Sequence, residues 1–268
     1  MRRRTLLGLP GLGAAVLALA SCSGEDEPVA AGTKTIRYGD DPSQFVELSL
    51  PSGTPRGVVV VIHGGFWKAA YDLSLGRPLA ADLVDRGWAA LNIEYRRVGR
   101  VGSGGGGGAP ATLDDVRAAI ATLDDQDLDL TRVVTLGHSA GGHLAACAGH
   151  AVDAVTHVVS QAGVLDLVAA DREGLGGGAV QAFLGHPAGT ADADVDPRQQ
   201  VPLDVPVWCV HATDDDTVPI SQSLDYVAAA TAAGAQATMV EVDGDHFVVI
   251  ETASEAWRQT VAILDGIG

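Results

Sequence analysis

The stretch VVTLGHSAGG at residues 133–142 decides the fold of this chain. Its first four residues are mostly apolar and β-branched, as in a buried strand, and the alanine-rich run after Ser139 favours a helix. Between them, Gly137, Ser139 and Gly141 form the pattern G-x-S-x-G. A serine on such a tight turn takes strained backbone angles, so its neighbours two residues away must be small. The stretch therefore predicts a serine hydroxyl raised above a parallel sheet, at a helix N-terminus.

Strands and helices alternate on both sides of this turn. The run VVVVI at residues 58–62 is typical of a strand buried on both faces, whereas residues 45–50 alternate as in an edge antiparallel strand. Further strands are predicted at residues 88–95, 132–136, 155–160, 206–210 and 237–242. Helices are predicted at residues 78–86, 112–123, 139–150, 220–233 and 254–264. This alternation predicts one α/β domain at residues 35–268, with a mostly parallel sheet and helices on both faces.

Two segments interrupt this alternation. Residues 165–205 are rich in Gly, Ala, Asp and Pro, and we expect them to form a short cap insertion over the C-terminal edge of the sheet. Residues 103–110 read SGGGGGAP, and the glycine run Gly104–Gly108 within them cannot build a core. We expect this loop to be either a flexible rim or a tolerated insertion.

The N-terminus is expected to be an export signal. Three arginines at residues 2–4 precede an apolar run at residues 5–20 that is too short and glycine-rich to span a membrane. The sequence Leu19-Ala20-Ser21-Cys22 then resembles a bacterial lipoprotein signal, in which the cysteine receives a diacylglyceryl group. The alternative is an ordinary secretory peptide cleaved nearby.

These residues predict a signal peptide at residues 1–21, a lipidated Cys22 and a flexible tether at residues 22–34. Two acyl chains anchor a protein stably, whereas one chain does not. We therefore expect the protein to be exported and anchored to the outer face of the bacterial cytoplasmic membrane, with secretion as the alternative.

The charge balance excludes one class of partner. The chain has 17 Lys and Arg against 34 Asp and Glu, a formal net charge of −17. Such a surface repels phosphate backbones, so we expect no nucleic-acid binding. Export would permit a disulfide between Cys147 and Cys209, but their apolar surroundings favour two buried, unpaired thiols.

Ser139 needs a base, because a serine hydroxyl is a poor nucleophile at neutral pH. In a sheet of this kind the triad runs Ser, acid, His along the chain, so the acid should follow the strand at residues 206–210. Three adjacent carboxylates stand there, at residues 214–216, and only one histidine, His246, comes after them. Elimination therefore selects His246 as the base.

The three carboxylates compete for the role of the acid. The pattern H-x-x-x-D-x-x-V-P, which begins at His211, selects Asp215. Asp214 is the next candidate and Asp216 the third. The chosen carboxylate would hold the imidazole tautomer and stabilise the imidazolium that forms during the reaction.

A tetrahedral intermediate carries an oxyanion, which needs backbone N–H donors. The stretch HGGFW at residues 63–67 directly follows a predicted strand, and its glycines let the chain turn its amides into the site. We select Gly65 and Phe66 as donors, together with Ala140, the residue after the nucleophile. Trp67 is expected either to line the substrate pocket or to pack beneath the loop.

Three motifs together resemble the α/β-hydrolase superfamily: HGGFW at residues 63–67, GHSAGG at residues 137–142 and DHF at residues 245–247. Within it, the chain is similar to the kynurenine formamidase and hormone-sensitive-lipase-like esterase branch. The resemblance implies an α/β-hydrolase fold and a Ser-His-Asp hydrolase that uses no metal and no organic cofactor. Phe66 replaces the third glycine of the HGGG form, and HGG-x-W looks like the formamidase side of the branch.

The expected function is that of a serine esterase acting on small carboxylic esters with short acyl or aryl groups. Residues 165–205 contain few large apolar side chains, which disfavours a lid for long-chain lipids. An arylformamidase or other amidase that uses the same site is the alternative. A metal-dependent hydrolase is disfavoured because no H-E-x-x-H spacing is present, and a catalytically inactive binding module because every part of the triad is present.

Overall fold

A computed structural model describes residues 32–102 and 104–267 of the 268-residue chain. The predicted signal peptide, the lipidation site at Cys22 and all but the last residues of the predicted tether lie outside these described residues.

The centre of the molecule is an eight-stranded sheet with the order β1-β2-β4-β3-β5-β6-β7-β8. Its strands are β1 (Lys34–Arg37), β2 (Phe45–Ser49), β3 (Val58–Ile62), β4 (Ala89–Ile93), β5 (Val133–His138), β6 (His157–Gln161), β7 (Val207–Ala212) and β8 (Ala237–Val242). The six neighbouring strands β4, β3, β5, β6, β7 and β8 run parallel to one another, whereas β2 is antiparallel to β1 and β4. The prediction of a mostly parallel sheet is confirmed.

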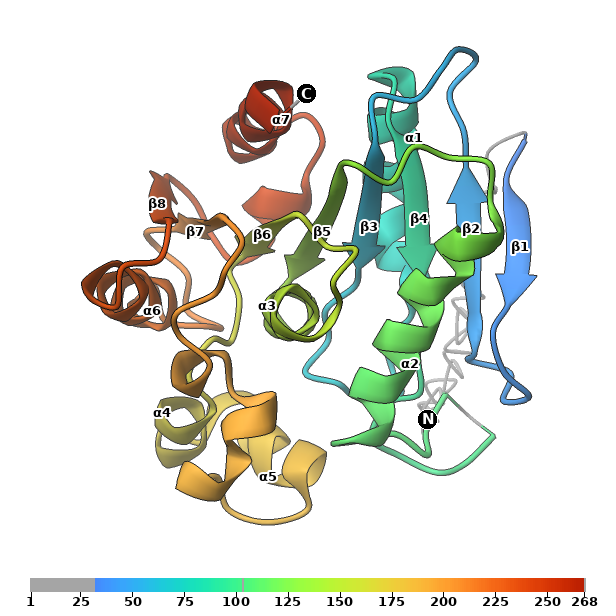
Figure 1. Cartoon of the computed structure of the whole chain (residues 1–268). Coiled ribbons are helices and arrows are strands. Elements are labelled where there is room, and N and C mark those ends of the chain that lie inside the picture. The colour runs from blue at the N-terminus through green and yellow to red at the C-terminus, as the bar shows by residue number, and fades with distance from the viewer. Residues whose placement is uncertain (1–31, 103, 268) are drawn as a thin grey trace, which may run out of the picture.

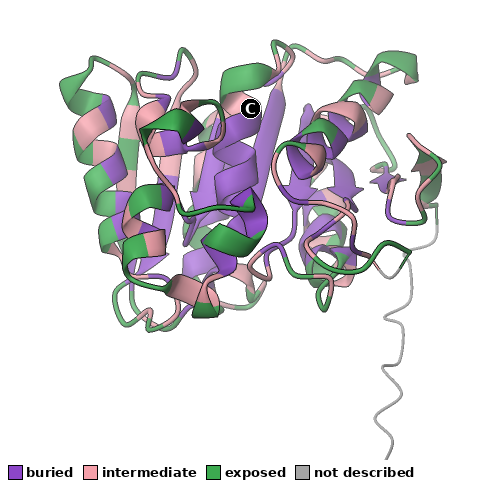
Figure 2. Cartoon of the chain, turned by 90° about the horizontal axis from the view of Figure 1, so that it is seen from below, coloured by how far each residue is buried: buried purple, intermediate pink, exposed green. Residues whose placement is uncertain are grey.

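Helices cover both faces of this sheet (Figure 1). One face packs against α1 (Arg77–Asp85) and α7 (Glu255–Ile267), and the other against α2 (Ala111–Ala121), α3 (Ala140–Ala151) and α6 (Ser221–Ala232). The core therefore has two apolar layers, one on each side of the strands. Figure 2 shows the central strands and the inner sides of the helices as buried, which matches strands with continuous apolar sequences.

The cap insertion follows β6. It holds α4 (Leu167–Arg172) and α5 (Ala179–Leu184), with short 3₁₀ helices at Leu175–Gly177, Thr190–Val195 and Pro197–Gln199. In Figure 1, α4 and α5 lie at the lower edge, toward which the arrowheads of β3 and β4 point. The insertion therefore lies beyond the carboxyl ends of the parallel strands.

The expectation that residues 45–50 form an edge strand is wrong, because β1 pairs outside β2. The side chains of β2 do alternate between the two faces of the sheet. Glu47 lies on the face that the pattern assigns to solvent, but it is buried and forms an ion pair with Arg77 of α1. A polar residue therefore points into the protein and not into solvent. The outer strand begins at Lys34, which the sequence assigned to the tether.

The glycine run Gly104–Gly108 packs closely against the segment that follows β4. Arg97 N–H donates to the Gly104 carbonyl (2.8 Å), and Gly107 N–H donates to the Arg97 carbonyl (2.8 Å). A Cβ atom on Gly107 would collide with the backbone carbonyl of Arg96. Glycine is therefore required because two backbone segments approach more closely than a side chain allows.

Candidate active site

Ser139 lies on the turn that joins β5 to α3. Its φ of +57° is in the region that a non-glycine residue rarely adopts, and its N–H donates to the Gln161 carbonyl at 2.8 Å. A Cβ atom on Gly137 would meet the Gly141 carbonyl, and one on Gly141 would meet the carbonyl of Ile62. The two flanking glycines are thus required sterically, for the reason that the G-x-S-x-G pattern implies.

Asp215 and His246 come together from the loops that follow β7 and β8. His246 Nδ1 lies 2.7 Å from Asp215 Oδ2, and both side chains are buried. Because a carboxylate only accepts hydrogen bonds, Nδ1 carries the proton, and a neutral ring then has a free Nε2 that can act as a base. Of the three candidate carboxylates, the structure places Asp215 beside His246, while Asp214 and Asp216 are exposed.

Asp215 accepts hydrogen bonds on both oxygens. Its Oδ1 receives the N–H groups of Thr217 (2.9 Å) and Val218 (2.8 Å). Its Oδ2 receives His246 and also lies 3.2 Å from Nε2 of a second buried histidine, His211. Burial acts to raise the pKa of Asp215, but the hydrogen bonds from the two imidazoles and the Val218 amide hold it well below its usual range. The carboxylate is therefore ionised.

Ser139 and His246 face one pocket of about 120 Å³. The pocket is lined by Gly65, Phe66, Tyr71, Leu75, His138, Ser139, Thr217, His246 and Phe247. Ser139 is 2% exposed and His246 is 3% exposed, so little water reaches either group. Between these two described residues there is no direct hydrogen bond, and such contacts in resting enzymes often close only when substrate is bound.

The loop after β3 packs directly against the Ser139 turn. A Cβ atom on Gly64 would lie 2.8 Å from the His138 carbonyl and 3.0 Å from Ser139 Cβ. The next residues, Gly65 and Phe66, have φ values of +109° and +51°. Among the described residues, the N–H groups of Gly65 and Phe66 donate no backbone hydrogen bond, and the N–H of Ala140, the first residue of α3, has no acceptor within its helix. These three amides beside the serine hydroxyl are the donors that an oxyanion needs.

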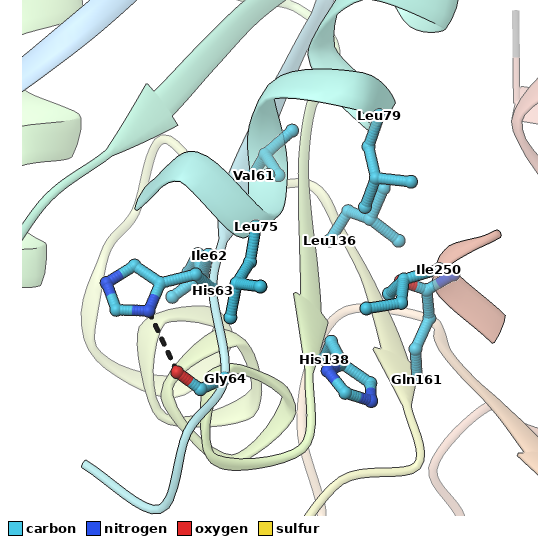
Figure 3. Close-up of a pocket in the computed structure, with 11 residues that line it drawn as sticks. Val61, Ile62, His63, Gly64, Leu75, Leu79, Leu136, His138, Gln161 and Ile250 are labelled. Carbon is cyan, nitrogen blue, oxygen red and sulfur yellow. Dashed lines mark hydrogen bonds between the residues drawn. The ribbon is translucent and has the colours of Figure 1, made fainter. Parts of the chain in front are cut away.

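A buried polar network holds this loop from behind. His63 Nδ1 donates to the Gly64 carbonyl at 2.8 Å, as Figure 3 shows, and the Tyr95 hydroxyl donates to the His63 carbonyl at 2.7 Å. Burial lowers the pKa of His63 to about 3, so its ring is neutral. Its Nε2 faces the buried ion pair of Glu94 and Arg97. His63 therefore positions the loop, and in Figure 3 its ring turns away from His138.

Trp67 does not line the pocket. Its side chain is fully buried, stacks on the Phe183 ring with centroids 4.6 Å apart and meets the edge of His143 at 5.1 Å. A φ of +55° turns it below the loop, toward α3 and α5. Of the two roles that the sequence left open for Trp67, the structure favours packing.

The sequence did not single out His138, the variable residue of the G-x-S-x-G pattern. Its Nε2 donates to the His246 carbonyl at 2.9 Å, and the two rings lie 4.5 Å apart. Burial, with a further effect of His246, lowers the pKa of His138 to about 3. Beneath it lies a cavity of about 10 Å³, where Figure 3 shows His138 beside Gln161. The motif sets no residue type at this position, so only the fold reveals the contact.

Neither a metal-ligand cluster nor a bilayer-spanning helix is found in the described part of the chain. Residues 32–102 and 104–267 contain no group of three or more His, Cys, Asp or Glu side chains that could hold a metal ion. The helices in these ranges are all too short or too polar to cross a bilayer. Cys147 and Cys209 are free, buried thiols in α3 and β7.

Comparisons with known proteins identify a family and several similar enzymes. The sequence profile of the BD-FAE family matches residues 47–229. Esterase LipC of Mycobacterium tuberculosis (strain ATCC 25618 / H37Rv) is 31% identical over 124 residues, which are 43% of this chain and 29% of that esterase. Kynurenine formamidase of Danio rerio is 28% identical over 133 residues, 49% of this chain and 43% of the formamidase. The chain thus spans less than half the length of either relative.

A solved structure shows how far the fold is shared. A truncated carbohydrate esterase from gut microbiota superposes with a TM-score of 0.76 over 90% of this chain and 97% of that chain, at 21% identity. At this identity the likeness shows the fold alone. The predicted α/β-hydrolase fold is confirmed, and so is the resemblance to the esterase and formamidase branch.

Proposed function

The chain belongs to the BD-FAE family, and from this we propose that it is a serine esterase that cleaves small carboxylic esters through an acyl-enzyme. One observation carries the proposal: the strained Ser139 and the Asp215-bonded His246 line one pocket together with Gly65 and Phe66. Nucleophile, base and oxyanion donors are the parts that acyl transfer requires.

In the proposed reaction, Ser139 Oγ attacks the ester carbonyl while His246 Nε2 takes the hydroxyl proton. The carbonyl oxygen becomes an oxyanion and accepts hydrogen bonds from the amides of Gly65, Phe66 and Ala140. When the intermediate collapses, the C–O bond to the alcohol breaks and His246 donates its proton to the leaving oxygen. Water then attacks the acyl-enzyme with the same base, and the acid is released.

The pocket favours small acyl or aryl groups. Its volume of about 120 Å³ is modest, and Phe66, Tyr71, Leu75 and Phe247 give it an apolar, aromatic lining. The cap adds no broad apolar surface for lipid, because its largest apolar side chain, Phe183, is buried. These features support short acyl and aryl esters over long-chain lipids.

An arylformamidase is the second candidate function. The similarity to the formamidase of Danio rerio and the HGGFW stretch at residues 63–67 favour it. A formyl group fits the same pocket and requires the same nucleophile, base and amides. Rates on a panel of acetyl, butyryl and aryl esters and N-formyl anilides, measured on one preparation, separate the two functions.

The proposed location is the outer face of the cytoplasmic membrane, with an anchor at Cys22. It is supported by the apolar run at residues 5–20 and the small residues before that cysteine. In a bacterial host, radioactive fatty acid should label the wild-type protein and not the Cys22→Ala variant. Equal labelling of both proteins would remove Cys22 as the anchor.

The Ser139→Ala variant tests the proposed mechanism. Turnover of p-nitrophenyl acetate should fall by at least about 10⁴-fold while the protein stays folded, because the nucleophile is lost. Ser160→Ala removes another buried hydroxyl and should keep wild-type rates. EDTA should have no effect. Substantial activity in Ser139→Ala, or strong inhibition by EDTA, would contradict the serine mechanism.

A further inference from the structure

Asp215 lies between two histidines, and the triad uses only one of them. His211 is the penultimate residue of β7 and is completely buried. Its Nε2 lies 2.9 Å from the Val218 carbonyl and 3.2 Å from Asp215 Oδ2, while its Nδ1 lies 2.7 Å from the Ser223 hydroxyl. The two imidazoles therefore contact the same carboxylate oxygen, one from β7 and the other from the loop after β8.

The partners of His211 fix the position of its proton. A carbonyl and a carboxylate only accept hydrogen bonds, so Nε2 must carry the hydrogen. In a neutral ring, Nδ1 then lacks a proton and accepts from the Ser223 hydroxyl. His211 thus donates one forked hydrogen bond, shared between the Val218 carbonyl and Asp215 Oδ2.

We propose that His211 is a positioning residue for the reaction: its Nε2–H, held by Ser223, fixes the Asp215 carboxylate in the orientation that directs His246 toward Ser139. This inference rests on the proposed serine-esterase function. Behind the nucleophile Ser139, three contacts then link four side chains in the order His246, Asp215, His211 and Ser223.

The hydrogen bonds of Asp215 explain why a second histidine matters. Two amides hold Oδ1, but Oδ2 has only the two imidazoles. Without His211, the position of Oδ2 would depend on His246 alone, which must move its own proton and charge during each turnover. A second donor from a strand fixes Oδ2 independently of His246, and it favours the charged carboxylate.

A purely structural role for His211 makes a different prediction. In that case the ring only joins β7 to Ser223 of α6 and to the Val218 loop, and any loss of activity follows the loss of stability. Two substitutions separate the roles. His211→Gln keeps an N–H near the Nε2 position, whereas His211→Asn keeps an acceptor near Nδ1 for Ser223 but loses the donor to Asp215.

The test measures kcat and KM for p-nitrophenyl acetate and, in the resting protein, the downfield proton resonance of the His246–Asp215 hydrogen bond. His211→Asn should lower kcat about 10- to 100-fold, the range expected for a lost hydrogen bond to a charged group, with KM within twofold of wild type. Its resonance should shift or broaden. His211→Gln should recover kcat to within a few-fold and restore the resonance.

The control is His143→Gln, which replaces an equally buried imidazole that donates to the Val195 carbonyl. It should lose stability and leave the resonance unchanged. If both His211 variants fail to fold, Ser223→Ala provides the test, because it removes the hydrogen bond that holds the His211 ring at Nδ1. This variant should lower kcat a few-fold and broaden the resonance.

Either of two results would overturn the role of His211 where its variants fold: wild-type kcat and resonance in His211→Asn, or an equal loss of kcat in His211→Asn and His211→Gln. Where neither variant folds, wild-type kcat and resonance in Ser223→Ala would overturn it. Failure of the proposed function looks different, because wild-type turnover would then persist in Ser139→Ala. The resonance needs no substrate and therefore reports on Asp215 in either case.

Discussion

At the scale of single residues, the choice of Asp215 from three adjacent aspartates is the sharpest prediction. Asp215→Asn should lower kcat by roughly 10⁴-fold, because an amide no longer selects the imidazole tautomer that a base requires. Asp214→Asn and Asp216→Asn change exposed side chains and should stay within about threefold of wild type. Single-turnover rates on p-nitrophenyl acetate decide the matter, and a large loss in either neighbour would contradict the assignment.

The sequence could predict those residues whose role follows from local spacing or chain order. The G-x-S-x-G spacing identifies Ser139, and the order of the triad leaves only His246 as the base. The role of His138 could not be predicted, because its contact with His246 joins residues 108 positions apart. His211 and the Glu94–Arg97 pair contact residues only four and three positions away, but spacing alone does not reveal that these polar side chains are buried together. A histidine beside a motif looks the same in sequence whether it supports the site or fills the core.

At the scale of elements, the close packing of the glycine run Gly104–Gly108 can be tested by substitution. Gly107→Ala should destabilise the protein by about 1–3 kcal/mol, because its Cβ would force the backbone away from the Arg96 carbonyl. For a domain of this size, each kcal/mol corresponds to roughly 2–4 °C in Tm. Gly53→Ala is the control, since a Cβ there meets nothing within 4 Å. Equal melting temperatures for the two variants would mean that the run is not packed.

The strands and helices that the sequence predicted well are those with a continuous apolar or strongly periodic pattern. The VVVVI run and the alanine-rich α3 lie within a few residues of their predicted limits. β1 was missed because KTIR at residues 34–37 is short and mostly exposed, so no burial pattern marks it. The packing of the glycine run could not be predicted, because composition does not reveal a close contact between two backbone segments.

At the scale of the whole molecule, buried neutral histidines predict sensitivity to acid. Burial lowers the pKa of His63 and of His138 to about 3 and that of His143 to about 4. Because the folded-state pKa values lie below the unfolded value of about 6.5, this stability is complete above that pH and is lost as pH falls toward the folded values. Between pH 7 and 5, most carboxylates stay ionised, so the histidines dominate the change.

Urea unfolding from pH 7 to pH 5 measures this effect. At pH values below the pKa of a histidine in the unfolded chain, each of these histidines should lower the free energy of unfolding by roughly 1.4 kcal/mol for each pH unit of acidification. His143→Gln should reduce the total slope by one such contribution. A free energy of unfolding that stays constant across this range would show that these rings take up protons equally in the folded and unfolded states.

The central claim joins three distant parts of the chain at one reacting atom, and a crystal structure of the protein inactivated by an aryl fluorophosphonate tests it most directly. We expect phosphorus bonded to Ser139 Oγ, the phosphoryl oxygen within hydrogen-bonding distance of the amides of Ala140 and of Gly65 or Phe66, and His246 Nε2 facing the adduct. An adduct on another residue, or a phosphoryl oxygen turned away from these amides, would contradict the claim.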